Sequence, residues 1–458
     1  MPSDADVLNA LKAVQDPDLH RDIVSLGFVK DLKTSGGDVA FTIELTTPAC
    51  PVKEQLKGEA EKRVRALSGV KTVSIQMTAN VRGRPGPAAP ILTGVKNLIA
   101  IASGKGGVGK STTTTNLAAA LARAGASVGI LDADVYGPSI PTMFGATERP
   151  AMNDKQQMIP LQRQGIKLMS MGFLADASTP VIWRGPIATQ LIRQFLGSVD
   201  WGILDYLLVD LPPGTGDVQL TLVQTAPLTG AVIVMTPQEV ALGVAKRGLK
   251  LFQQTNVPIL GVVENMSGFE CPKCGETTAI FKQGGGKAAA KELGLPFLGS
   301  VPLDPETVLG GDAGEPVVTR SPEAPAARAF RQVAGELARQ AAIVSAGMAE
   351  ATSRPETIEP LGPAALKITW DDAHVSTYAY RSLRLACPCA LCVDEWTGAR
   401  RLDPASVPGD VHAVSSGTIG RYALNFRWSD GHDSGIYTYG RLRSLCECPA
   451  CRKTAAAG

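Results

Sequence analysis

One nine-residue segment, GKGGVGKST at residues 104–112, constrains what this chain can fold into more than any other feature. Four of its residues have the spacing GxxxxGK[ST] of a phosphate-binding loop: Gly104, Gly109, Lys110 and Ser111. In such a loop, glycines let backbone N–H groups surround phosphates, the lysine reaches the terminal phosphates and the hydroxyl meets magnesium. A strand-like run, NLIAIAS, precedes the loop, and a helix-like run, STTTTNLAAALARAG, follows it. This strand, loop and helix order is the context that a phosphate site requires.

The alternation of strands and helices continues well beyond this loop. Strand-like runs separated by helical ones occur at Leu98–Ala102, Val128–Leu131, Tyr206–Val209, Ala231–Met235 and Ile259–Val263. Continuous apolar strands that alternate with helices indicate a parallel sheet buried on both faces. We therefore predict an α/β fold, a P-loop NTPase parallel sheet with helices on both faces.

Length and proline content indicate further domains, because a chain of 458 residues exceeds what one core usually supports. Residues 1–80 alternate helical and strand-like runs and predict a small α+β domain. The proline-rich RGRPGPAAP lies in an expected linker at 81–93, since proline lacks the N–H donor of a strand ladder. The large α/β domain is expected at 94–347. A second expected linker at 348–363 precedes a small, mainly β domain at 364–458.

Two segments that follow predicted strands carry aspartates. ILDADVYGPS contains Asp132 and Asp134, and YLLVDLPPGTGD contains Asp210. Ligands in open parallel sheets bind at the carboxyl ends of the strands, so these carboxylates should converge on the nucleotide. We expect Asp210 to hold magnesium through water and the Asp132/Asp134 pair to order the attacking water. The alternative is that strand-end aspartates only cap helices.

At these residues the region 94–347 resembles the deviant Walker A ATPases, which include septum-site and plasmid-partition ATPases and the nitrogenase iron protein. In that family a second lysine, here Lys105, crosses a dimer interface to the nucleotide of the other subunit, so the resemblance implies a nucleotide-linked homodimer. By the same resemblance Asn265, in GVVENMSGF, contacts the adenine. A turn former at the end of a strand is the alternative for this asparagine.

The motif and the resemblance together assign roles by residue. Catalytic roles are expected for Lys105, Lys110, Asp134 and Asp210. Magnesium ligation is expected for Ser111, Asp132 and Asp210. Nucleotide contacts are expected for Gly104, Lys105, Gly106, Gly107, Val108, Gly109, Lys110, Ser111, Thr112 and Asn265.

The chain has nine cysteines, and all but Cys50 occur in close groups. In a reducing compartment such spacing indicates metal ligation rather than disulfides. Cys271 and Cys274, in FECPKCG, provide two thiolates, whereas a tetrahedral zinc or a 4Fe-4S cluster needs four ligands. A two-fold axis would bring the same pair from both subunits and complete the four. A zinc knuckle is the alternative, since CPxCG is common in zinc ribbons.

The combination of ENMSGFECPKCG with the nucleotide motifs resembles the Mrp/ApbC group of iron-sulfur cluster carriers, and WRGP at Trp183 and LPPGTGD at Leu211 match that group too. The resemblance implies a carrier that binds and hydrolyses ATP with magnesium, holds a 4Fe-4S cluster between two subunits and transfers it to apo-proteins. An upstream cluster scaffold would be its source. Two rival hypotheses are an electron donor like the nitrogenase reductase, in which the cysteines lie far apart in sequence, and a partitioning or positioning ATPase.

The first 80 residues, with DPDLHRDIVSLGFV and TTPACP, resemble the SufT-like small domain that is often fused to these carriers. Cys50 precedes Pro51 at an expected helix start, where the helix dipole favours a thiolate and hence a nucleophile or transient ligand. A buried structural cysteine is the alternative.

The C-terminal region, with LACPCALCVDEWTG and RWSDGHDSGIY, resembles the N-terminal zinc domain of gamma-butyrobetaine hydroxylase. The resemblance implies zinc held by four residues: Cys387, Cys389, Cys392 and His432. Structural zinc contributes on the order of 10 kcal/mol, which matters in a small domain. The oxygenase domain of that enzyme is absent, so no oxygenase activity is implied, and an iron-sulfur cluster is the alternative occupant.

A third cysteine group departs from that family's pattern. RLACPCALC from Arg384 and RSLCECPAC from Arg443 share the frame R-x-x-C-x-C-x-x-C, which is a partial duplication or a coincidence of spacing. Cys446, Cys448 and Cys451 could hold a 4Fe-4S cluster with one labile iron, or zinc with a fourth ligand from elsewhere. A disordered cysteine tail is the alternative. The order of the three domains resembles that of the chloroplast carriers named for high chlorophyll fluorescence.

Composition and targeting signals bound the partners. The formal net charge is +2 and 19% of the residues are charged, which argues against electrostatic binding to nucleic acid or to a membrane surface. No apolar run reaches the roughly 18–20 residues of a membrane helix, and the N-terminus lacks secretory and transit patterns. We therefore expect a cytoplasmic protein that binds neither nucleic acid nor membrane, while its expected partners, a second copy of the chain and apo-proteins, are those that the resemblance implies.

Overall fold

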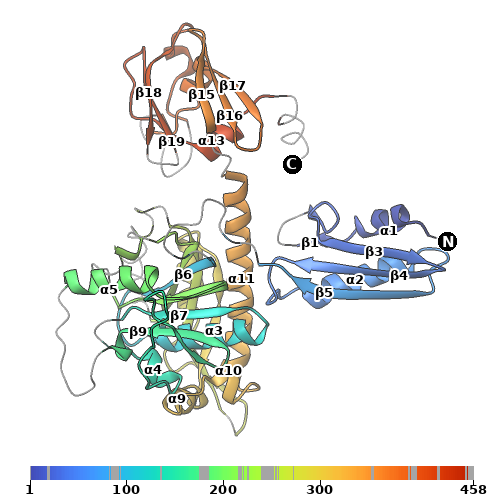
Figure 1. Cartoon of the computed structure of the whole chain (residues 1–458), viewed down its shortest axis with the longest axis vertical. Coiled ribbons are helices and arrows are strands. Elements are labelled where there is room, and N and C mark those ends of the chain that lie inside the picture. The colour runs from blue at the N-terminus through green and yellow to red at the C-terminus, as the bar shows by residue number, and fades with distance from the viewer. Residues whose placement is uncertain are drawn as a thin grey trace. The chain divides into compact units, whose positions relative to one another are not determined.

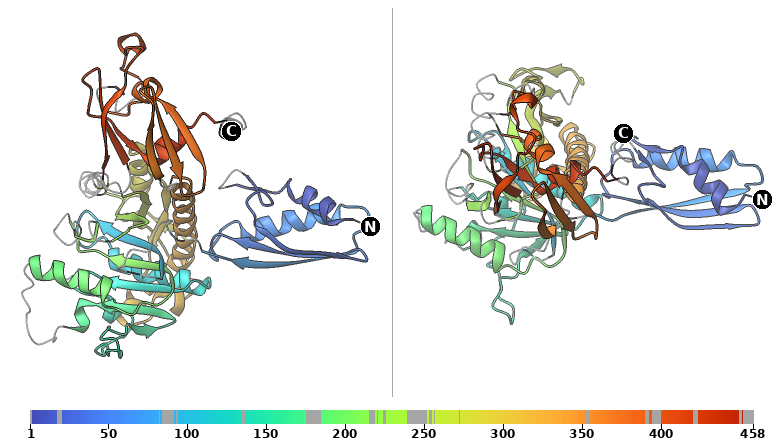
Figure 2. Two further views of the ribbon diagram at one scale, coloured as in Figure 1. Left: turned by 45° about the horizontal axis from the view of Figure 1, so that its top comes forward. Right: turned by 90° about the horizontal axis from the view of Figure 1, so that it is seen from above.

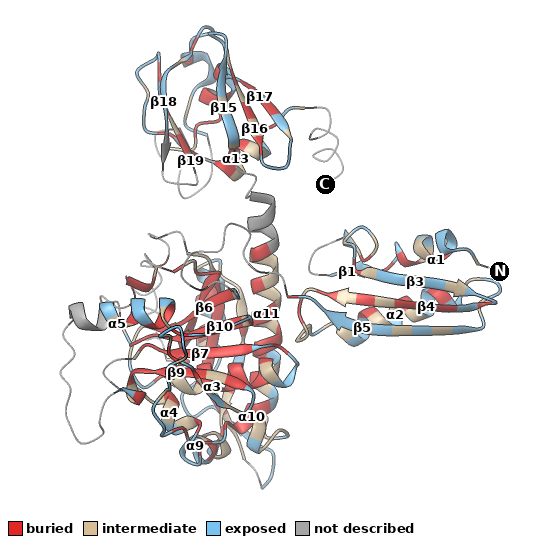
Figure 3. Ribbon diagram, viewed as in Figure 1, coloured by how far each residue is buried: buried red, intermediate tan, exposed pale blue. Residues whose placement is uncertain are grey.

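The chain forms two compact units, Met1–Ser345 and Ala346–Gly458. The first unit holds two separate apolar cores, and the second holds one of its own (Figure 3). The computed structural model describes residues 2–17, 21–81, 83, 92, 94–134, 137–174, 185–214, 219, 221–223, 226–238, 252, 255, 257–271, 273–351, 355–389, 392–393, 400–419, 423–448 and 451.

A nine-stranded sheet lies in the first unit, where Figure 1 labels its strands β6, β7 and β9. Among its described strands, β8 and β13 pair in the antiparallel sense and the others are parallel. In spatial order the strands are β13 (Thr277–Thr278), β12 (Ile259–Glu270), β11 (Gly230–Met235), β6 (Val95–Ser103), β10 (Leu204–Asp210), β7 (Val128–Asp132), β9 (Ile166–Ser170) and β8 (Leu161–Arg163), with β14 (Phe297–Leu303) also beside β12. All five strand-like runs of the sequence lie in this sheet, so the predicted α/β fold is confirmed.

Helices pack on this sheet (Figure 2). α3 (Lys110–Arg123) contacts β6, β7, β9 and β10, and α8 (Gly285–Glu292) contacts β12 and β14. The alanine-rich α11 (Pro325–Ala351) approaches β14 so closely that a Cβ on Gly299 would lie 2.9 Å from Cγ2 of Val333. Further helices are α4 (Ile140–Met143), α5 (Gly185–Gly197), α9 (Pro305–Asp312) and α10 (Val317–Arg320). None of the helices that the structure describes is long and apolar enough for a membrane crossing.

The N-terminal part has the α+β character expected from its sequence. Its elements are α1 (Asp4–Leu11), β1 (Gln15–Asp16), β2 (Arg21–Asp22), β3 (Val29–Ser35), β4 (Asp38–Leu45), α2 (Lys53–Arg65) and β5 (Thr72–Ala79). β4 pairs with β3 in the antiparallel sense and with β5 in the parallel sense. Alternate residues of β4 are buried, which places Ile43 in the same apolar core as Leu56 and Val64 of α2. Most of the expected linker 81–93 lies outside the described residues.

The C-terminal unit is mainly β, as expected. It contains two three-stranded antiparallel sheets, each followed by a short helix. The elements are β15 (Pro355–Leu361), β16 (Ala365–Trp370), β17 (Val375–Ala379), α12 (Tyr380–Leu385), β18 (Ala413–Ile419), β19 (Ala423–Trp428), β20 (Ile436–Thr438) and α13 (Tyr439–Ser444). Aromatic side chains fill the core, where Phe426 lies 5.0 Å from Trp428 and 5.2 Å from Tyr437 between ring centroids.

The segment expected as a second linker, 348–363, carries regular structure at both ends. α11 continues to Ala351, and β15 occupies Pro355–Leu361. Prolines suggested a linker here, but β15 pairs only with β16 and is an edge strand, where a missing N–H donor is tolerated.

Candidate functional site

The phosphate loop lies at the carboxyl end of β6, in the middle of the parallel sheet, and runs into α3 at Lys110. Gly107 and Gly109 both have a φ of +77°, a left-handed conformation that glycine adopts without strain. A Cβ on Gly109 would also lie 2.2 Å from Nδ2 of Asn265. The left-handed backbone therefore favours glycine at both positions, and at Gly109 any side chain would also displace the Asn265 amide.

A cavity of about 220 Å³ opens over this loop. Its lining includes Gly106, Lys110, Ser111 and Thr112 of the loop together with Asp134. Loop N–H groups, a lysine, hydroxyls and a carboxylate thus face one space, which is the composition of a nucleotide phosphate site.

Asp210 connects the loop to the neighbouring strand β10. Its side chain has no exposed surface, and it accepts hydrogen bonds from Lys110 Nζ at 2.7 Å and Ser111 Oγ at 2.5 Å. Thr114 Oγ1 donates to the other carboxylate oxygen at 2.6 Å. The structure therefore brings together three residues expected to act on phosphate and magnesium, and adds Thr114, which sequence reasoning missed.

Asp132 is also fully buried, but its carboxylate serves the backbone after β7. It accepts from Ser170 Oγ at 2.9 Å and from the N–H groups of Asp134 at 3.1 Å and Ile140 at 3.3 Å. Burial, and then the nearby charge of Asp210, raises the pKa of Asp132 to about 7. Because Ile140 begins α4, these contacts match the capping alternative more closely than direct magnesium ligation.

Two further predicted residues contact the region of the loop. Asn265, in β12, donates from Nδ2 to the carbonyl of Val108 at 2.9 Å and is almost fully buried. Lys105 is half-buried, and its Nζ lies 3.3 Å from Oε1 of Gln238, a residue that no motif indicated. The adenine contact and the crossing of a dimer interface remain predictions for these two side chains.

Cys271 and Cys274 form a tight turn directly after β12, which we call the knuckle (residues 271–276). The N–H of Gly275 donates to the Cys271 carbonyl at 2.8 Å, and the N–H of Cys271 donates to the Glu276 carbonyl at 2.9 Å. Gly275 has a φ of +73°, which explains the glycine of CPxCG. The N–H groups of Lys273 and then Cys274 lower the pKa of Cys271, because they stabilise its thiolate.

Both cysteines of the knuckle are accessible to solvent. Cys274 is exposed and Cys271 is half-buried. Within the described part of the chain, no further Cys, His, Asp or Glu joins this pair in a possible metal group. At the knuckle, the described part of one chain therefore offers two cysteine ligands, as the sequence indicated.

Glu264 of β12 binds the segment that leads from the knuckle into α8, and sequence reasoning missed this residue. Its fully buried carboxylate accepts from Ser267 Oγ and from the N–H groups of Gly284, at 3.0 Å, and Gly286. Gly284 is the N-cap of α8, so Glu264 ties the middle of β12 to the start of this helix. A charged residue in an apolar strand run was the signal available in the sequence.

Cys50 lies between β4 and α2, half-buried against the apolar core of the N-terminal part. α2 begins at Lys53, so Cys50 precedes the first helical turn rather than occupying it. Among the described residues it belongs to no group of possible metal ligands. This placement is closer to that of a structural cysteine than to that of a nucleophile or a transient metal ligand.

The first triad, Cys387, Cys389 and Cys392, meets His432 as predicted. Nε2 of His432 lies 3.2, 3.4 and 3.8 Å from the three sulfurs in that order. A tetrahedral zinc bound at about 2.3 Å to sulfur and about 2.0 Å to nitrogen sets these atoms about 3.5 Å apart. Burial raises the pKa of Cys387 to about 12, and a cation at this position would favour its thiolate instead.

The second triad, Cys446, Cys448 and Cys451, lies against His374. Sequence reasoning left the fourth ligand open, and His374 was not among the candidates. The signal that could have identified it is the shared frame W-x-D-x-H, which occurs at Trp370–His374 and at Trp428–His432.

Three family models match the chain in order. The NUBPL iron-transfer P-loop NTPase matches residues 94–338, which is 245 of 458 residues. An iron-sulfur cluster assembly protein model matches residues 4–76. The gamma-butyrobetaine hydroxylase-like N-terminal model matches residues 363–443.

Known proteins are similar over much of the chain. An iron-sulfur cluster carrier protein of Synechocystis sp. is 50% identical over 338 residues, covering 72% of this chain and 96% of that protein. The chloroplastic Fe-S cluster assembly factor HCF101 of Arabidopsis thaliana is 40% identical over 455 residues, covering 97% of this chain and 83% of that protein. A solved nucleotide-binding protein of Archaeoglobus fulgidus in complex with ADP is 46% identical, covers 48% of this chain and 87% of its own, and superposes with a TM-score of 0.44. The family match and the two sequence relatives show that the chain belongs to the NUBPL-type iron-transfer P-loop NTPase family.

Proposed function

We propose that this protein carries an iron-sulfur cluster on the knuckle cysteines, binds and hydrolyses ATP at the phosphate loop, and transfers the cluster to apo-proteins. The observation that carries the proposal is strand β12, which joins the two sites. Asn265, within this strand, donates to the loop carbonyl of Val108 at 2.9 Å, and Cys271 directly follows the last residue of the strand. Relatives named as iron-sulfur cluster carriers support the same function.

The cluster is cargo and requires four thiolates, whereas each knuckle offers two. An isologous contact around a two-fold axis would place two knuckles face to face and complete the set. The exposure of Cys274 and the lowered pKa of Cys271 both support ligation at such a surface. We therefore infer a homodimer that holds one 4Fe-4S cluster between its subunits.

The residues around the cavity support ATP hydrolysis. Ser111 and Asp210 would hold magnesium, which supplies charge neutralisation on the phosphates when bound. Lys110 reaches the same carboxylate and would contact the terminal phosphates. Asp134 lines the cavity and would orient the attacking water, and Lys105 of the other subunit would stabilise charge that develops on the phosphates.

We infer that nucleotide state reaches the cluster through β12. Phosphates that draw the loop around themselves would shift the Val108 carbonyl, and the Asn265 hydrogen bond would pass this shift along the strand. Glu264, one residue earlier in the same strand, accepts a hydrogen bond from the N–H of Gly284 at 3.0 Å and so ties β12 to the start of α8. A change in the strand would therefore alter how the two knuckles face each other and how firmly they hold the cluster.

Anaerobic reconstitution with iron and sulfide tests the proposal. The wild type should bind about two irons and two sulfides per chain, as one cluster per dimer. The double variant Cys271→Ser/Cys274→Ser should lose the cluster, while Cys50→Ser, the matched control, should keep it. Lys110→Ala should keep the cluster and lose ATP hydrolysis. An intact cluster in the double variant, or zinc without iron at the knuckle, would refute cluster carriage at this site.

We also propose that the first triad and His432 hold structural zinc, because their sulfur-to-nitrogen separations fit a single tetrahedral ion. The nine free cysteines support a reducing compartment, and we infer the cytoplasm.

A further inference from the structure

The C-terminal unit repeats one arrangement in two halves. β15, β16, β17 and α12 precede the first triad, and β18, β19, β20 and α13 precede the second triad. In each half the middle strand ends in a tryptophan that opens a turn holding a histidine. The backbone N–H of Trp370 donates to the His374 carbonyl at 2.8 Å, and the backbone N–H of Trp428 donates to the His432 carbonyl at 2.8 Å. The cysteine frame shared by the two triads is therefore one part of a structural repeat.

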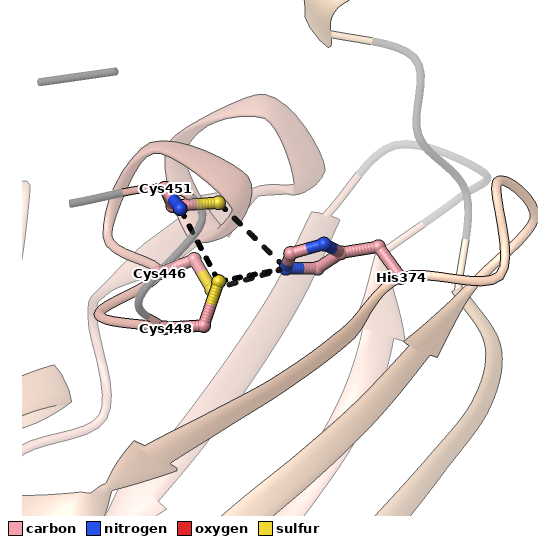
Figure 4. Close-up of side chains that lie close together, drawn as sticks. All are labelled: His374, Cys446, Cys448 and Cys451. Atoms are coloured by element: carbon pink, nitrogen blue, oxygen red, sulfur yellow. Dashed lines mark hydrogen bonds between the residues drawn. The ribbon is translucent and has the colours of Figure 1, made fainter. Parts of the chain in front are cut away.

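The histidine of the first half reaches the cysteines of the second half (Figure 4). Nε2 of His374 lies 3.3 Å from the sulfur of Cys446, 3.6 Å from that of Cys448 and 3.7 Å from that of Cys451. These separations match those between His432 and the first triad and bracket the value of about 3.5 Å expected around tetrahedral zinc.

The surroundings of the two groups match as well. Arg443 donates to Asp372 at 2.8 Å and to the Cys451 sulfur at 3.8 Å, and Asp372 accepts from the His374 N–H at 3.0 Å. The first site has the same bonds: Arg384 to Asp430 at 2.7 Å, Arg384 to Cys392 at 3.4 Å, and the His432 N–H to Asp430 at 3.1 Å. In each site one arginine therefore joins a cysteine sulfur to the turn that presents the histidine.

We propose that His374 and the second triad form a second zinc site, so that the C-terminal unit binds two zinc ions. Three sulfurs and one imidazole are a complete tetrahedral donor set for zinc. All four ligand atoms lie within 4.8 Å of one another, a spacing that suits one ion rather than a four-iron cluster, which holds its ligands farther apart.

The two halves exchange their histidine ligands, so both ions would connect the same two halves. Each ion takes three cysteines from one half and one histidine from the other half. Each ion thus cross-links the halves, and loss of either should loosen the ligands of the other.

Metal analysis of the full chain tests this proposal. The parent for the experiment is Cys271→Ser/Cys274→Ser, which removes the knuckle thiols, so that the result does not depend on the proposed cluster carriage. The parent should contain two zinc ions per chain by mass spectrometry. His374→Ala and His432→Ala should each lower this to one, whereas His412→Ala, an exposed histidine outside both groups, should leave two.

A cobalt titration of the metal-free parent gives a second measurement that needs no histidine variant. Thiolate-to-cobalt absorption should increase up to two equivalents per chain and then stop. Saturation at one equivalent, two zinc ions retained in His374→Ala, or iron and sulfide bound to the parent in place of the second zinc would each overturn the proposal.

Discussion

Replacing Asp210 by asparagine tests whether the buried ion pair beneath the phosphate loop is the central contact of the nucleotide site. Asp210 has no exposed side-chain surface, and its partner Lys110 is 6% exposed, with 2.7 Å between Nζ and Oδ2. Strand β10 provides a matched control at its other end, where Asp205 pairs with Lys96 at 2.9 Å but the two side chains are 17% and 35% exposed. Both substitutions make the same chemical change in a lysine–aspartate pair, and the pairs differ in burial. The other hydrogen bonds differ as well, since Asp210 also accepts from Ser111 and Thr114 and Asp205 from the Ser127 N–H.

The expected magnitudes differ accordingly. Asp210→Asn leaves the Lys110 charge buried without its counter-ion, which costs about 3–5 kcal/mol. Asp205→Asn breaks a solvent-screened pair and should cost at most about 1 kcal/mol. In a domain of this size about 1 kcal/mol shifts Tm by roughly 2–4 °C, so we expect a loss of about 6–20 °C for Asp210→Asn and under about 4 °C for Asp205→Asn.

Scanning calorimetry of the full chain, following the transition of the nucleotide domain, measures both shifts. ATP with magnesium should raise this Tm in the wild type and in Asp205→Asn, and should fail to do so in Asp210→Asn, because Asp210 lies beside Ser111 Oγ. Equal shifts in the two variants without nucleotide would refute the argument from burial. Undiminished nucleotide stabilisation of Asp210→Asn would refute its place in the magnesium site.

Three further predictions concern the same unit. Asp132→Asn should gain stability relative to the wild type as the pH rises from about 4 to about 7. In this range the folded wild type keeps a proton on Asp132 that its unfolded state releases, so the wild type loses stability with rising pH and the asparagine variant does not. Tm measured at pH 5 and pH 7.5 checks this, and a pH-independent difference between the two proteins contradicts it. Gly275→Ala forces an alanine into the left-handed conformation, which costs about 1–2 kcal/mol, and should weaken cluster retention roughly tenfold in a chelator challenge. The control Gly58→Ala, in α2, should retain the cluster as the wild type does. Equal retention in the two variants would contradict the argument from backbone strain. Asn265→Ala should load its cluster normally but release it at the same rate with and without ATP in absorption kinetics, and a preserved nucleotide response would exclude β12 as the route.

The parts of the molecule that could be predicted from sequence are those whose chemistry is local in the chain. The phosphate loop is one segment between one strand and one helix, so spacing alone identifies Lys110 and Ser111. The sheet was predictable because its strands are buried on both faces and therefore appear as unbroken apolar runs. Asp210 was predictable because parallel strands end at a common edge, although its three hydrogen bonds were not.

Contacts between segments distant in sequence could not be predicted in the same way. Gln238 lies near Lys105, and Glu264 supports the start of α8, only because separate segments fold against each other. Asp132 shows a related limit. Its position after a strand suits either magnesium ligation or capping, and only the observed N–H donors favour capping.

The exchanged ligands of the C-terminal unit follow from how its two halves pack, rather than from the cysteine spacing alone. The Tyr378 hydroxyl of the first half donates to the Leu442 carbonyl of the second at 2.6 Å, and the Tyr437 hydroxyl of the second donates to the Leu383 carbonyl of the first at 2.9 Å. Because Leu383 and Leu442 lie in the helices that lead into the two triads, each tyrosine positions the cysteines that the histidine of its own half approaches. A chance approach of one histidine to three cysteines would not reproduce these bonds in both halves, so the second metal group is a property of the repeat itself.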